Sequence, residues 1–194
     1  MQQGFYFDQT RCTGCFACAV ACKDWHDIPA GPVKWRTVSS LERGAFPTPF
    51  LAYLSSSCYH CETPPCRDVC PVEAISKREQ NGIVVVDSEL CLGSRCGLCK
   101  GACPYDMPQF ADGGDDKMQK CDFCLERSEA GEKPVCVESC PLRALDSGSM
   151  EELRKRYGQE QDAAGFEYAQ GAKPAVIFKP KGLSRNSLLV TLIP

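Results

Sequence analysis

The sequence predicts an α+β fold made of two similar cysteine-rich modules, together with a strand-containing insert and a C-terminal extension. Three features of the 194-residue chain support this prediction. The sixteen cysteines fall into four groups of four, and no cysteine follows Cys140. In addition, a sequence pattern of an apolar strand followed by an aspartate and then a cysteine occurs twice. The cysteine groups therefore define the modules, and the segments between and after them define the insert and the extension.

The first cysteine group sets the chemistry. Cys12, Cys15, Cys18 and Cys22 are separated by two, two and three residues, which is the spacing of ferredoxins. In two-cluster ferredoxins the first three thiolates bind one [4Fe–4S] cluster, and the fourth binds the neighbouring cluster. A single run of this kind is also compatible with a zinc site or with half of a disulfide framework.

Three further groups favour iron over these alternatives. Disulfide frameworks place cysteines irregularly along loops, whereas every cysteine here belongs to a group. A proline follows the fourth cysteine in three groups, where its fixed φ turns the chain away from the cluster. The later groups are Cys58, Cys61, Cys66 and Cys70; Cys91, Cys96, Cys99 and Cys103; and Cys121, Cys124, Cys136 and Cys140.

Two short strands are predicted to precede cysteine groups. Residues Phe5 to Asp8 lead to Cys12, and residues Ile83 to Asp87 lead to Cys91, with an aspartate four residues ahead of the cysteine each time. The offset of 79 residues indicates internal duplication of a two-cluster unit. Two unrelated strands that happen to lead into loops are the alternative.

The insert after the first group is rich in proline and glycine and is expected to be mostly surface scaffold. Val33 to Val38 and Phe50 to Leu54 are apolar enough to pair as strands. Trp25, His26 and Trp35 are expected to shield a cluster from water. His60 lies inside a complete cysteine group, so a supporting or surface position is expected for it rather than iron ligation.

The segment after Cys140 has a different character. Ser149 and Glu152 have the spacing of a capping box, and Gly158 is placed to end the helix that follows. Met150, Leu153 and Tyr157 share one face of that helix, and Ala175 to Phe178 is a plausible strand.

The predicted clusters are strongly anionic, because an oxidised [4Fe–4S] core with four thiolates has a formal charge of about −2. Backbone N–H groups and basic residues beside the cysteines are expected to offset this charge. Because each cluster joins distant cysteines, the chain is expected to need iron to fold. The basic residues are Arg11, Lys23, Arg67, Arg95, Lys100, Lys120 and Arg143.

Other functions find no support in the sequence. The chain has no glycine-rich phosphate loop, no dinucleotide-binding motif and no cysteine outside the groups, and its net charge of −3 does not suggest nucleic-acid binding. No signal peptide or transmembrane helix is expected, since the longest apolar run, Leu188 to Ile193, is far too short to span a bilayer. Redox centres without a substrate site indicate an electron carrier.

Several motifs resemble one family, the four-cluster iron–sulfur subunits of molybdopterin oxidoreductases such as dimethyl-sulfoxide reductase, polysulfide reductase and formate dehydrogenase. The resemblance runs from about Phe5 to Lys179. It is most specific at Cys12 to Cys22, at Cys58 to Pro71, at Lys120 to Cys124, and at Cys136 to Leu145.

This resemblance implies two ferredoxin-like modules that carry four clusters, with ligands shared between cysteine groups. It implies a large molybdopterin-containing catalytic subunit as one partner, and a membrane anchor or another redox subunit as the second. The implied ligand sets are Cys12, Cys15, Cys18 and Cys140; Cys22, Cys121, Cys124 and Cys136; Cys58, Cys61, Cys66 and Cys103; and Cys70, Cys91, Cys96 and Cys99.

We expect residues 1–22 and 104–145 to form the first module, 23–57 the insert, 58–103 the second module, and 146–194 an extension for partner docking. The chain itself is then not an enzyme. It is expected either in the cytoplasm or at a membrane, held there by partners, and export of the folded chain together with a partner is a further alternative. A free-standing polyferredoxin and a hydrogenase-type electron-transfer subunit are the alternative functions.

The third group departs from the family pattern. Four residues separate Cys91 from Cys96 instead of two, and Ser94 stands where a cysteine is usual. Cys96 is expected to reach the iron through the longer loop, and a [3Fe–4S] cluster is the alternative.

Overall fold

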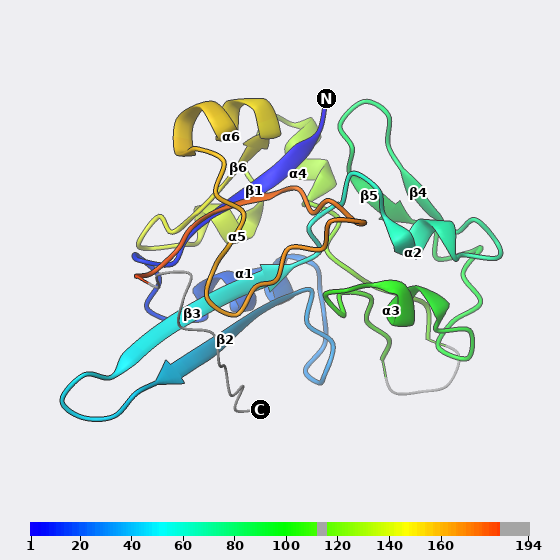
Figure 1. Ribbon diagram of the computed structural model, residues 1–194. Helices are drawn as coiled ribbons and strands as arrows, with labels where there is room; N and C mark the ends of the chain where they lie inside the picture. The colour runs from blue at the N-terminus through cyan, green and yellow to red at the C-terminus, as the bar shows by residue number, and fades with distance from the viewer. Residues whose placement is uncertain (112–115, 183–194) are drawn as a thin grey trace.

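The computed structural model describes residues 1–111 and 116–182. It mixes short helices with three small sheets, which agrees with the predicted α+β class. Figure 1 shows the three-stranded sheet and its helices on one side, a long hairpin projecting from the centre, and a second group of short elements on the other side. The apolar run at Leu188 to Ile193 lies outside the described residues.

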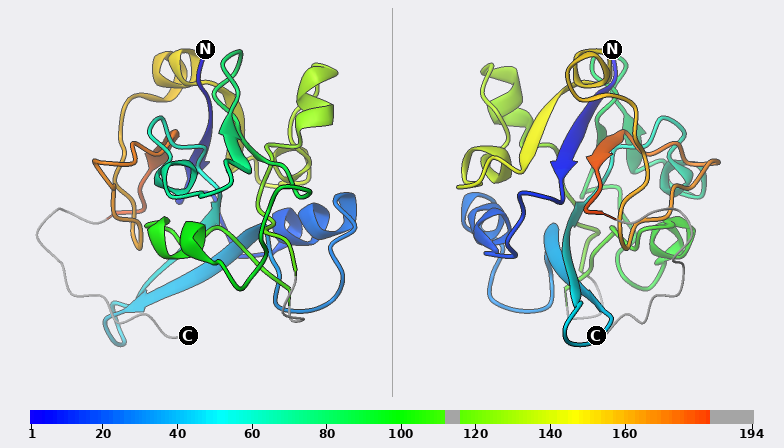
Figure 2. Two further views of the ribbon diagram at one scale, coloured as in Figure 1. Left: turned by 90° about the vertical axis from the view of Figure 1, so that its right-hand side faces the viewer. Right: turned by 60° about the vertical axis from the view of Figure 1, so that its left-hand side comes forward.

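The three-stranded sheet is organised around the N-terminal strand β1 (Gln3–Asp8). Strand β6 (Leu145–Ser149) pairs with it antiparallel, and β7 (Val176–Lys179) pairs with it parallel on the other edge. Figure 2 shows β1 between these two later strands. The strands predicted at Phe5 to Asp8 and at Ala175 to Phe178 are confirmed, although β7 begins one residue later.

Helix α6 (Met150–Tyr157) covers one face of this sheet through Met150 and Leu153. The predicted cap is present, because the Ser149 side chain accepts a hydrogen bond of 3.2 Å from the Glu152 N–H. The Glu152 carboxylate accepts a 2.8 Å bond from the Ser149 hydroxyl rather than from its backbone N–H. Gly158, at a φ of 88°, ends the helix as predicted.

The insert forms an antiparallel hairpin of β2 (Arg36–Arg43) and β3 (Phe50–Ser57). The prediction that these segments pair is correct, but the range Val33 to Val38 is wrong for the first strand, which begins at Arg36 and extends through Arg43. Residues 39 to 43 are mostly polar, and they are extended because each pairs with a residue of β3. One face of the hairpin is buried, at Leu41, Ala52 and Leu54, so this part of the insert belongs to the core.

A smaller hairpin, β4 (Ile75–Lys77) with β5 (Val84–Val86), lies near helices α2 (Pro65–Asp68) and α3 (Leu98–Ala102). Its hydrogen bonding resembles that of β1 and β6. The Asp87 N–H donates to the Ala74 carbonyl at 2.8 Å, and the Asp8 N–H donates to the Ala144 carbonyl at 2.8 Å. The two aspartates therefore donate backbone hydrogen bonds to alanines just ahead of the paired strands, and the internal duplication of the chain stays a prediction.

The remaining helices lie in the cysteine segments. They are α1 (Ala17–Trp25), α4 (Leu125–Glu129) and α5 (Val135–Glu138), and α1 packs against α5. The main core lies between the sheet and the base of the long hairpin, and cysteine side chains form part of it. Because these helices are short, the conformation of the cysteine segments is expected to depend largely on the metal centres that their thiols bind.

Removal of the α6 cap is expected to open that helix locally. Ser149→Ala deletes both hydrogen bonds to Glu152, which costs about 1 kcal/mol and raises the open population about fivefold. Native-state hydrogen exchange should show correspondingly faster exchange of the α6 amides, with β4 amides unchanged as an internal control. Equal exchange in the variant and the parent would contradict a stabilising cap.

Candidate metal centres

All sixteen cysteines lie in the described part of the chain, and every one is unpaired. The structure therefore contains none of the disulfides that the sequence left open. The thiols gather into four sites. In each site three cysteines come from one of the four sequence groups, and the fourth comes from another group. The family resemblance implied the same four sets as cluster ligands, and their role as ligands stays a prediction.

Site 1 comprises Cys12, Cys15, Cys18 and Cys140, which line a single pocket beneath the hairpin and β6. The first three come from the loop after β1 and from the start of α1, and Cys140 follows α5. The Cys15 side chain is exposed and that of Cys18 is buried. Site 1 thus opens to the surface on one side.

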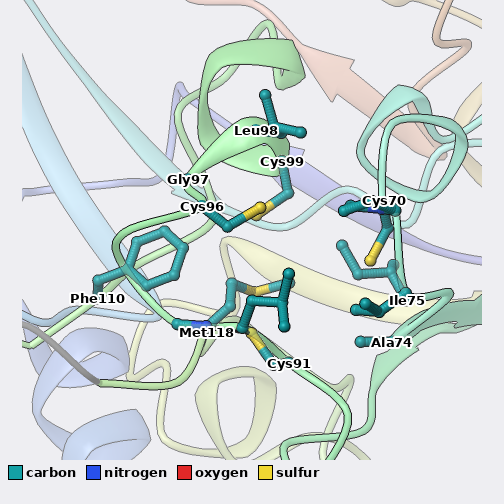
Figure 3. A pocket seen from close by; sticks show the side chains of 14 residues that line it. Cys70, Ala74, Ile75, Cys91, Cys96, Gly97, Leu98, Cys99, Phe110 and Met118 are labelled. Atoms are coloured by element: carbon teal, nitrogen blue, oxygen red, sulfur yellow. Dashed lines mark hydrogen bonds between the residues drawn. The ribbon is translucent and has the colours of Figure 1, made fainter.

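Site 4 comprises Cys70, Cys91, Cys96 and Cys99, which line another pocket with Phe110 and Met118 (Figure 3). The longer loop between Cys91 and Cys96 turns at Gly93, whose φ is 80° and whose carbonyl accepts a 3.1 Å bond from the Cys96 N–H. This turn brings Cys96 to the pocket wall. The extra two residues of the third group therefore do not remove Cys96 from the site.

Site 2 comprises Cys22, Cys121, Cys124 and Cys136, all of them buried. Their closeness is evident in the titration of their thiols. Burial raises the pKa of Cys22 to about 12, and the Cys136 and Cys124 thiols add to this rise. Burial also raises the pKa of Cys121, and Cys22 and Cys136 contribute again.

Site 3 comprises Cys58, Cys61, Cys66 and Cys103. Burial raises the pKa of Cys61 to about 12, with further contributions from the other three thiols. Burial likewise raises the pKa of Cys66 to about 12. Thiols of this kind carry their protons at neutral pH, so binding of a cationic metal centre has to release those protons.

Neighbouring sites are joined by short helical segments. In four pairs of cysteines the second lies four positions after the first, which is about one turn of an α-helix. One pair lies wholly within α1, and in the other three the first cysteine lies in a short helix and the second just beyond its end. The two members of each pair serve neighbouring sites. The pairs are Cys18 and Cys22, Cys136 and Cys140, Cys66 and Cys70, and Cys99 and Cys103.

Backbone N–H groups point at several sulfurs. The N–H of Gly93 lies 3.4 Å from Cys91 Sγ, and the N–H of Ala144 lies 3.2 Å from Cys140 Sγ. Left-handed residues such as Phe16 and Phe123 turn the chain so that successive N–H groups face inward. A cavity lined by thiols and N–H donors fits an anionic iron–sulfur cluster.

The aromatic residues Trp25, His26 and Trp35 of the insert have separate roles. His26 Nε2 lies 3.4 Å from Cys124 Sγ and 3.6 Å from the Asp122 carboxylate, and its ring packs against Trp35. Trp25 instead lies under the Arg127 guanidinium and is half exposed. His26 and Trp35 therefore cover site 2, as expected for shielding residues.

His60 is fully buried, so the surface position offered for it is wrong. Its Nδ1 accepts a 3.1 Å hydrogen bond from the Val84 N–H, which ties the second cysteine group to β5. Burial and the nearby Lys120 and Lys77 ammonium groups keep the pKa of His60 well below its usual value. His60 is thus a neutral supporting residue beside site 3.

The basic residues predicted to offset cluster charge differ in burial. Lys120 is buried and donates to the carbonyls of Val84 and Cys121. Arg67 pairs with Asp68, and Lys100 pairs with Asp106, both at the surface. Sequence reasoning missed Arg36, which is buried between sites 1 and 2, because no cysteine or charge pattern near it marks its position.

The sequence of this chain is similar to those of known proteins. A family model described as a 4Fe-4S dicluster domain matches residues 49–150. The B subunit of the anaerobic dimethyl sulfoxide reductase of Escherichia coli (strain K12) is 44% identical over 192 residues, which covers 95% of this chain and 91% of the relative. The corresponding subunit of Haemophilus influenzae is 40% identical over 195 residues, covering 96% and 93%. Protein NrfC of E. coli is 34% identical over 184 residues, covering 93% and 81%.

Replacement of Cys96 tests the longer loop. If Cys96 binds iron, Cys96→Ala should convert or eliminate one cluster and change its electron paramagnetic resonance signal. Leu92→Ala, at an exposed residue lining the same pocket, is the matched control and should leave the spectrum unchanged. A Cys96→Ala spectrum identical to that of the parent would mean that this site holds three irons without Cys96.

Proposed function

Since this protein belongs to the 4Fe-4S dicluster family of iron–sulfur subunits, which includes the B subunit of anaerobic dimethyl sulfoxide reductase, we propose that it conducts electrons along four [4Fe–4S] clusters. One end of this path meets a molybdopterin-containing catalytic subunit, and the other meets a membrane anchor or another redox partner. The protein is an electron-transfer subunit and not itself an enzyme.

The ligands proposed for the four clusters are the thiols of sites 1 to 4. Four grouped cysteines per site match the ligand requirement of a cubane. Four thiols also suit zinc, but structural zinc sites are closed and separate, whereas helical turns here link each site to a neighbour. A bound cluster supplies a one-electron redox centre, and this chain supplies its ligands, its N–H donors and its cover from water.

The sites form a continuous series. Helical turns join site 1 to site 2 and site 3 to site 4. Sites 2 and 3 meet where Cys121 and Cys58 belong to one packed cluster of buried residues. This arrangement supports passage of electrons through the clusters of Cys12, Cys22, Cys58 and Cys70 in that order, or in reverse.

The gradient of burial along this series is the observation that carries the proposal. All four cysteines of site 2 and three of site 3 are buried, whereas every cysteine of site 4 is partly exposed and Cys15 of site 1 is exposed. Exposed apolar side chains line the two outer pockets, Phe16 and Leu142 at site 1, and Leu92 and Leu98 at site 4. Buried inner centres with open, apolar ends suit a conductor between two docked proteins.

The same ends favour a bound subunit over the alternatives. A diffusing polyferredoxin needs one site of exchange and gains nothing from apolar side chains exposed at two. A hydrogenase-type subunit would present similar ends, and the relationship to the B subunit of dimethyl sulfoxide reductase favours the molybdopterin partner.

The proposed modules follow the site pairs. Residues 1–22 with 104–145 contain all the cysteines of sites 1 and 2, and residues 58–103 contain all the cysteines of sites 3 and 4. The extension 146–194 completes the sheet through β6 and β7, and α6 presents exposed charged residues such as Arg156 on its outer side. We place partner docking on this outer surface. No helix within residues 1–111 and 116–182 could cross a membrane.

Anaerobic purification tests the proposal. The holoprotein should contain about sixteen irons and as many acid-labile sulfides per chain, because four sites of four thiols each hold one cubane. It should also co-elute with a larger molybdopterin-containing subunit in gel filtration. Chelation of the iron should abolish the compact state, as judged by far-ultraviolet circular dichroism and elution volume.

Each measurement has a contrary outcome. Stoichiometric zinc without sulfide would rule out the clusters. A loaded protein that elutes as a monomer from its native source would indicate a diffusing ferredoxin. Leu92→Glu and Phe16→Glu, which place charge at the two ends, should each weaken one partner's binding while leaving iron content unchanged.

A further inference from the structure

Arg36 is a buried cation at the start of β2. Its side chain is almost inaccessible, with 3% of the residue exposed. The guanidinium donates hydrogen bonds to the hydroxyls of Ser55 at 3.1 Å and Ser57 at 2.8 Å, both on the paired strand β3. It also lies over the ring of Phe5, 4.8 Å from the centroid. Hairpin and sheet together hold the charge in one position.

No carboxylate is paired with this guanidinium anywhere in the described part of the protein. Hydroxyl groups satisfy its donors but do not neutralise its charge, and an unpaired buried charge is costly to keep away from water. Arginine does not escape this cost by losing its proton, because its pKa is too high. A negative group other than Asp or Glu must therefore compensate for it.

The groups around Arg36 are the thiols of two different sites. Ser55 Oγ, its hydrogen-bond acceptor, lies 3.5 Å from Cys18 Sγ of site 1. On the other side Arg36 lies close enough to Cys136 of site 2 to lower the pKa of that thiol, against the rise that burial causes. The titratable groups nearest to the guanidinium are four thiols, Cys18 of site 1 and Cys136, Cys121 and Cys22 of site 2.

We propose that Arg36 is the countercharge shared by the clusters of sites 1 and 2, and that it makes both easier to reduce. The inference rests on the proposed function in one respect, namely that these sites hold clusters. It adds a positioning residue from the insert, a segment that contributes no ligand.

The sign of the effect follows from the charges. Reduction transfers one electron from an external donor to the cluster and takes the cluster with its thiolates from about −2 to about −3, with no bond made or broken. A fixed positive charge nearby stabilises the more negative state more strongly. Because Arg36 lies between the two sites, its removal should make reduction harder at both.

Lys120 provides a matched comparison. It is also buried, and its ammonium group donates to backbone carbonyls, those of Val84 and Cys121. It lies close to Cys66 of site 3 and next to Cys121 of site 2, and thus on the side of site 2 away from site 1. Its removal should leave the cluster of site 1 unaffected.

The test is a dithionite titration of the anaerobically purified holoprotein, followed by electron paramagnetic resonance at low temperature. Arg36→Gln should lower the reduction equilibrium constants of the clusters at sites 1 and 2 at least tenfold, which is about 59 mV for one electron. The other two clusters should change less than threefold. Arg36→Lys, which keeps the charge, should recover most of the loss, and Lys120→Met should not shift the site 1 cluster.

Cys140→Ser identifies the signal of site 1, because it alters a ligand of that site alone. Unchanged potentials in Arg36→Gln, an equal shift of all four clusters, or the same shift of site 1 in Lys120→Met would overturn the proposal. Loss of clusters from both Arg36 variants would make the residue purely structural and would also overturn it. Iron and sulfide analysis of the parent separately tests whether the clusters exist.

Discussion

The spacing of two cysteines four positions apart is the constraint on which the rest of this structure depends. At that spacing one short segment, helical at least where it starts, carries a thiol for each of two neighbouring sites. Two such segments, one from each of two cysteine groups, meet across every adjacent pair of sites within a module. The distance between redox centres is therefore set by backbone geometry, and neither long helices nor a large apolar core is needed to maintain it.

Thiolates gathered in four sites concentrate negative charge, and three kinds of group in the fold could offset it. N–H groups of left-handed turns face the sulfurs, and buried cations lie between sites where two sets of thiols contribute to the same field. Surface arginines and lysines are mostly engaged with carboxylates or carbonyls and contribute less, because water screens them. Burial, rather than the number of basic residues, determines which charges act on the clusters.

Features set by local chemistry were predictable from the sequence. The apolar run before Cys12 predicted strand β1, the Ser149 cap predicted where α6 begins, and Gly158 predicted where it ends. Features set by distant groups were not predictable in this way. The strand β2 extends through polar residues because β3 lies beside it, β7 runs parallel to β1 on an edge that no local pattern specifies, and Arg36 is buried because thiols from distant segments approach it. Grouping across segments came from family resemblance, since spacing alone does not say which cysteine completes a site.

The central place of β1 has a consequence for the order of events during synthesis. Strand β1 is synthesised before β6 and β7, the two strands that flank it in the sheet. Site 1 likewise lacks Cys140 until most of the chain has been made. The N-terminal thiols must therefore wait, reduced and unligated, while roughly a hundred or more residues are added. A protein with this topology completes site 1 only after sites 3 and 4, so its N-terminal thiols need a reducing environment while the intervening chain is made.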